Sequence, residues 1–87
     1  MKSLTELRSQ IDVVDDELVR LFVKRMDLVD QVAAVKRADG KAVLDGNREQ
    51  EVLARAAKVA GELRSKSAQE FMKKAMDIAK AKETEII

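Results

Sequence analysis

The fold is decided by residues 4–37, LTELRSQIDVVDDELVRLFVKRMDLVDQVAAVKR. Apolar side chains recur at every third or fourth position over almost five heptads, at Leu4, Leu7, Ile11, Val14, Leu18, Leu21, Leu28, Val32 and Val35. This spacing is typical of an amphipathic helix, and neighbouring apolar residues widen its face. Only Arg25 interrupts the row. The stretch therefore predicts one long helix with a charged residue inside its apolar face.

Signals at both ends define the length of this helix. Ser3 and Glu6 have the spacing of a capping box, and Asp39-Gly40 is a stop signal. At 1.5 Å per residue the helix would be roughly 50 Å long. A globular domain of this length should have a radius of gyration near 12 Å, so the helix is longer than any globule its own chain could build. We therefore expect an intertwined homodimer whose long helices run antiparallel.

A second helix is predicted after a connection with two turn signals, Asp39-Gly40 and Asp45-Gly46. Asn47, with a glutamine three residues later, is a suitable cap for a helix that begins at Arg48, and Asp45 is an alternative cap. Its apolar side would contain Val52, Leu53, Ala56, Val59, Ala60 and Leu63.

A third helix is predicted from another capping box, formed by Ser67 and Glu70, to about Thr84. Phe71, Met72, Ala75, Met76 and Ala79 would form its apolar side. The chain has no proline and no β-rich run, so residues 1–87 are predicted to be one all-α domain of three helices.

Composition excludes several kinds of chemistry. Lys and Arg number 17 and Asp and Glu 16, so the net charge of +1 does not favour nucleic acid or a membrane as a partner. Without cysteine or histidine, thiolate catalysis, the usual zinc sites and serine–histidine relays are absent. No apolar run is long enough to cross a membrane, and we expect a cytoplasmic protein. The remaining side chains suit binding of an anionic small molecule.

Three basic residues on the first helix allow a geometric argument. Arg25 and Lys36 are eleven residues apart, about three full turns, so they lie on one face. Arg8 is roughly 25 Å from Arg25 along the axis, so it could join them only from an antiparallel second chain. Alternatively, Arg25 is a register device in an apolar seam, and Arg8 and Lys36 are ordinary solvated residues.

A longer series of residues has the spacing of a known family: Leu7-Arg8, Ile11-Asp12, Asp15, Leu18, Leu21, Lys24-Arg25, Val32, Lys36 and Asp45-Gly46-Asn47-Arg48-Glu49. This series resembles the bacterial class of the all-α (AroQ-type) chorismate mutases. The resemblance covers essentially the whole chain and is specific through about Leu53. It implies conversion of chorismate to prephenate, by a Claisen rearrangement that needs no metal or cofactor, in phenylalanine and tyrosine biosynthesis (the shikimate pathway).

The resemblance also implies roles for individual residues. Arg25, with Arg8 of the neighbouring chain, would bind the substrate's carboxylates, since a guanidinium can bind both oxygens. Lys36 would donate to the ether oxygen. Arg48 would support the charged site.

The ring hydroxyl would be held by Glu49 and by Asp45, the latter through its backbone. Ala79 stands where a serine often contacts a carboxylate. Glu83 stands where a glutamine usually makes a second contact to the ether oxygen, although some family members, fungal ones among them, have glutamate there. We therefore expect Lys36, Glu83 and Arg25 to be the catalytic residues.

Two other functions are compatible with these residues. Isochorismate-pyruvate lyases share this fold and the clamping of carboxylates. A non-catalytic helical dimerisation or regulatory domain could keep the same scaffold, and the changes at Ala79 and Glu83 would fit it. Retention of Arg25 argues against this view, because a dimer seam would gain stability from leucine there. The chain could be a stand-alone enzyme or one domain of a bifunctional protein.

Overall fold

The protein is all-α, as the sequence predicts. The computed structural model describes residues 1–86, and its elements are α1 (Leu4–Asp39), α2 (Gly46–Ala60), the short 3₁₀ helix η1 (Glu62–Arg64) and α3 (Ser65–Ile86). No strand is present among the described residues.

Both predicted ends of α1 are confirmed. The Ser3 hydroxyl accepts a hydrogen bond from the backbone N–H of Glu6 at 3.2 Å, and the Glu6 carboxylate accepts one from the N–H of Ser3 at 3.4 Å. After Asp39 the backbone turns into the left-handed region at Gly40, with φ 69°. Glycine adopts this conformation without a Cβ clash, so the helix ends there.

The start of α2 differs from the first expectation. Asp45, not Asn47, is the N-cap residue: its backbone is extended, and its Oδ1 accepts a hydrogen bond from the N–H of Arg48 at 3.1 Å. A cap residue needs a non-helical backbone, whereas Asn47 already lies within the first turn of the helix.

The predicted capping box at the start of α3 is wrong. The chain leaves α2 at Gly61, with φ 81°, and passes through η1 directly into α3. Ser65 begins α3 and its hydroxyl donates to the carbonyl of Glu62 at 3.2 Å. Ser67 therefore lies inside the helix, where its backbone cannot take the extended conformation of a cap.

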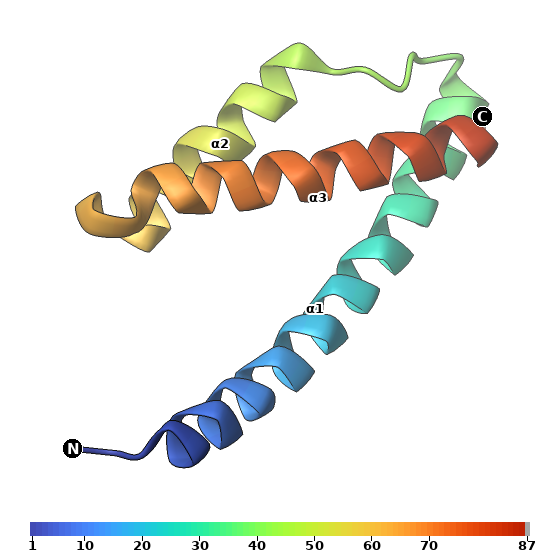
Figure 1. Cartoon of the computed structure of the whole chain (residues 1–87). Helices are drawn as coiled ribbons and strands as arrows, with labels where there is room; N and C mark the ends of the chain where they lie inside the picture. Colours follow the sequence, from blue (N-terminus) through green and yellow to red (C-terminus); the bar gives the residue numbers. More distant parts are fainter. Residues whose placement is uncertain (87) are drawn as a thin grey trace.

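The three helices form an open arrangement rather than a globule. α3 packs against both α1 and α2, while the half of α1 nearer the N-terminus extends away from them (Figure 1). The molecule measures 56 × 25 × 15 Å, and its radius of gyration is 16.0 Å. A compact chain of this length would have about 12 Å.

The buried core of the single chain is very small. Among the described residues, Ala33, Ala75, Met76, Ala79 and Glu83 are the buried ones. The apolar row of α1 is exposed along its length, from Leu4 at 61% through Leu18 at 42% to Val35 at 59%. Apolar faces of this extent in water usually mark a contact surface. The antiparallel homodimer remains a prediction that agrees with this exposure.

Candidate active site

A cavity of about 270 Å³ lies where the C-terminal half of α1, the start of α2 and the second half of α3 meet. Its walls combine apolar side chains with seven ionisable ones: Arg25, Lys36, Asp45, Arg48, Glu49, Lys80 and Glu83. The apolar part comes from Leu28, Val29, Val32, Val43, Val52, Met76 and Ala79. A concave apolar surface with a few convergent polar groups is typical of a small-molecule site.

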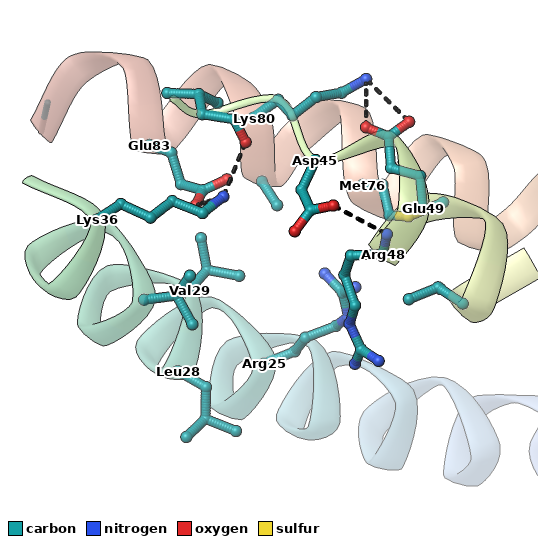
Figure 2. A pocket seen from close by; sticks show the side chains of 14 residues that line it. Arg25, Leu28, Val29, Lys36, Asp45, Arg48, Glu49, Met76, Lys80 and Glu83 are labelled. Atoms are coloured by element: carbon teal, nitrogen blue, oxygen red, sulfur yellow. Dashed lines mark hydrogen bonds and ion pairs between the residues drawn. The ribbon is translucent and has the colours of Figure 1, made fainter. Parts of the chain in front are cut away.

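Lys36 is fixed by two neighbours. Its Nζ donates to the carbonyl oxygen of Val43 at 2.7 Å and lies 3.0 Å from Oε1 of Glu83 (Figure 2). The side chains of Lys36 and Glu83 are only 17% and 8% exposed. An ion pair this far from solvent is weakly screened, so the ammonium is held in one place. An ammonium has three donors; the Val43 carbonyl accepts one of them and the Glu83 contact is an ion pair, so at least one donor remains for a ligand.

Arg25 contributes an unpaired donor. Its Nη1 is buried and has no hydrogen-bond partner among the described residues. Arg25 and Arg48 lie on one side of the cavity in Figure 2, and Lys36 and Glu83 on the other. Leaving a buried charged donor without a partner is costly, and an anion in the cavity would remove that cost. The cavity is therefore suited to a ligand with a carboxylate or a similar group.

The start of α2 presents polar groups at the cavity because of its cap. The Asp45 side chain accepts a hydrogen bond from the N–H of Arg48. The backbone carbonyl of Asp45 accepts a second hydrogen bond, from the N–H of Glu49 at 3.0 Å. The Arg48 guanidinium pairs with Glu51 at 3.2 Å, and both side chains are about two-thirds exposed, at 66% and 68%. Arg48 is thus exposed, whereas Arg25, Lys36 and Lys80 are only partly exposed.

A second ion pair links α2 and α3 across the cavity. Lys80 Nζ lies 3.2 Å from Oε2 and 3.5 Å from Oε1 of Glu49, and 3.5 Å from Oδ1 of Asp77 (Figure 2). Hydrogen bonding to Glu49, with a smaller contribution from Asp77, raises the pKa of Lys80 above its ordinary value of 10.5. Lys80 is accordingly a protonated cation at neutral pH.

Comparison with known protein families identifies the family of this chain. Residues 7–84 match the family described as chorismate mutase type II. The chain belongs to this family. It is also 47% identical, over 49 residues, to the T-protein of Haemophilus influenzae. The match covers 56% of this chain but only 13% of the T-protein. No solved structure matches the chain.

Most of the residues that resemblance to the chorismate mutase family selected lie around the one cavity. Arg25, Lys36, Asp45, Arg48, Glu49, Ala79 and Glu83 all line it. Arg8 does not: it lies on the exposed N-terminal half of α1, away from the other helices. The roles given to these residues stay predictions.

Sequence reasoning missed Lys80. It lies four residues after Met76 and three residues before Glu83 on α3, and these two helical spacings were the available signal. In the described part of the chain, no group of His, Cys, Asp and Glu side chains is arranged to hold a metal ion. No helix of that part is long and apolar enough to cross a membrane.

Proposed function

We propose that this chain is a chorismate mutase, which converts chorismate to prephenate. The proposal rests mainly on Nη1 of Arg25, which is buried and has no hydrogen-bond partner among residues 1–86, in a cavity that also holds the fixed ammonium of Lys36. Membership of the chorismate mutase type II family supports the same reaction. The substrate is a dianion, and these two groups are cations that need no activation.

The reaction requires positioning and charge rather than a nucleophile. One carbon–oxygen bond of the ether breaks while one carbon–carbon bond forms within the same molecule, and no proton is transferred. The cavity must hold the compact conformer and stabilise negative charge that develops on the ether oxygen. Lys36 is suited to this task because Val43 and Glu83 fix its ammonium and leave at least one N–H to donate.

The substrate has two carboxylates, and Arg25 is the arginine that α1 of one chain brings to the cavity. Arg25 binds one carboxylate in this proposal, and Arg8 of a second chain binds the other. The exposed apolar row of α1 supports the required homodimer, because two antiparallel copies would cover it. Each dimer then has two equivalent sites, and each site draws Arg8 from one chain and Arg25 from the other.

The remaining residues complete the pocket. Glu49 and the backbone of Asp45 hold the ring hydroxyl, and the capping bond of the Asp45 side chain supports this use of the backbone. Arg48 adds positive charge at the entrance. Ala79 provides a small wall, and Glu83, 3.0 Å from the ammonium of Lys36, lies beside the place of the ether oxygen.

Incubation of the purified chain with chorismate and, separately, with isochorismate tests the proposal. Formation of prephenate from chorismate, lost in an Arg25→Ala variant, is the expected result. Salicylate and pyruvate from isochorismate would indicate a lyase instead. No turnover of either compound by the folded protein would contradict both and favour a non-catalytic scaffold.

A further inference from the structure

Lys80 is the one cation of the cavity without a role in the proposed reaction. It is placed by contacts on two helices: Asp77 lies one turn earlier on α3, at 3.5 Å, and Glu49 lies on α2. Both oxygens of the Glu49 carboxylate are within 3.5 Å of the Lys80 ammonium. The Lys80 and Glu49 side chains are 34% and 26% exposed, so the pair is partly shielded from water.

These contacts constrain a residue that faces the substrate. A glutamate side chain has three rotatable bonds, and an unpaired carboxylate on the first turn of a helix would be free to turn toward solvent. Contact of both oxygens with one ammonium selects a single orientation. Each carboxylate oxygen still has a lone pair available, so Glu49 can accept another hydrogen bond while it stays paired.

The charge of Glu49 creates a second requirement. Three carboxylates line the cavity, from Asp45, Glu49 and Glu83, and without Lys80 they would be matched by only three cations. A neutral pocket gives little attraction for a dianion, and an unpaired carboxylate beside it would repel it. Lys80 cancels the charge of Glu49 where the two helices meet.

We propose that Lys80 is a positioning residue for the substrate: it holds the Glu49 carboxylate in the cavity and neutralises it, so that Glu49 can accept a hydroxyl hydrogen bond from a dianionic ligand. The proposal rests on the proposed function. It assigns Lys80 an effect on substrate binding that is exerted through Glu49, with no direct contact to the reacting atoms.

The test compares Lys80→Met and Lys80→Arg with a matched control, Lys82→Met. Lys82 lies on the same helix and pairs with Glu85 at 3.7 Å, outside the cavity. Loss of Lys80 should raise the KM for chorismate about twofold to fivefold, the range of a partly exposed charge contact, and change kcat by less than about 1.5-fold. Lys80→Arg should restore most of the binding, and Lys82→Met should match the wild type.

A double variant separates positioning from mere helix packing. In a Glu49→Gln background there is no carboxylate to pair, so Lys80→Met should raise KM no further. An equal rise in both backgrounds would overturn the proposal. An unchanged KM in Lys80→Met would also overturn it. This includes a variant in which kcat and the melting temperature fall together, because that pattern shows that Lys80 only stabilises the packing of the helices.

The same measurements distinguish this proposal from the proposed function. A wild-type protein that forms prephenate, combined with a Lys80→Met variant of unchanged KM, contradicts only the role of Lys80. A wild-type protein that neither turns over chorismate nor binds prephenate in calorimetry contradicts the proposed function and, with it, the role of Lys80.

Discussion

Replacement of Glu83 by glutamine should increase activity at neutral and alkaline pH. Glu83 Oε1 lies 3.0 Å from Lys36 Nζ, and the side chain is only 8% exposed. An ionised carboxylate in this place cannot donate a hydrogen bond, and it repels charge that develops on the ether oxygen. Glutamine has nearly the same shape, remains neutral and can donate.

The size of the effect follows from this geometry. An ether oxygen about 2.9 Å from the same ammonium, along a second tetrahedral direction, would lie about 5 Å from the Glu83 oxygen. Two unit charges at that distance interact by about 3 kcal/mol at an effective dielectric constant near 20. About half a charge on the transition-state oxygen reduces this to about 1.5 kcal/mol, which is roughly tenfold in kcat/KM.

The assay is kcat/KM for chorismate at neutral pH. The Glu83→Gln value should exceed the wild-type value about tenfold, because glutamine removes the repulsion and supplies a donor. Glu85→Gln, on the same helix but with a side chain 72% exposed, is the control and should follow the wild type. Equal values for wild type and Glu83→Gln would contradict this prediction and place Glu83 outside the reacting centre.

Three further predictions concern assembly and stability. Sedimentation should give a dimer at micromolar concentration, because the α1 face exposes Leu4, Leu18 and their neighbours; a stable, active monomer would contradict this. Asp45→Ala should lower the free energy of unfolding by about 1 kcal/mol in urea titrations and Asp45→Asn by much less, because asparagine also caps; equal losses would argue against capping. Because the pKa of Lys80 is raised on folding, its ion pairs contribute fully below pH 10.5 and are lost as pH rises through the folded-state pKa. The difference in melting temperature between wild type and Lys80→Met should therefore be constant from about pH 7 to 9 and shrink only at a pH above 10.5, and a difference that grows with pH would contradict the assignment.

The sequence predicts α1 and the face on which each of its side chains lies, because both depend on helical periodicity alone. The eleven-residue interval places Arg25 and Lys36 on one face of any straight helix, and both line the cavity. The ends of α1 were predictable because Ser3 and Gly40 are strong signals with no competitor nearby.

What sequence reasoning missed depends on contacts between segments. Asp45 and Asn47 are equally good caps by residue type, and Asp45 is the cap because its backbone is extended, which the sequence does not reveal. Ser67 is not a cap because the backbone is already helical from η1 onward, before α3 reaches this residue. Lys80 was not selected because a lysine on an amphipathic helix usually faces solvent, and its partner Glu49 lies 31 residues away in the chain.

Because each site for the dianion is proposed to take residues from two chains, two inactive variants should complement each other when they are mixed. Arg8→Ala and Arg25→Ala should each nearly abolish chorismate turnover, because each leaves a carboxylate unpaired. After subunit exchange at equal concentrations, half of the dimers should be mixed and each should contain one intact site. The mixture should then recover about one quarter of wild-type activity. A mixture that stays inactive although exchange has been demonstrated would contradict the claim.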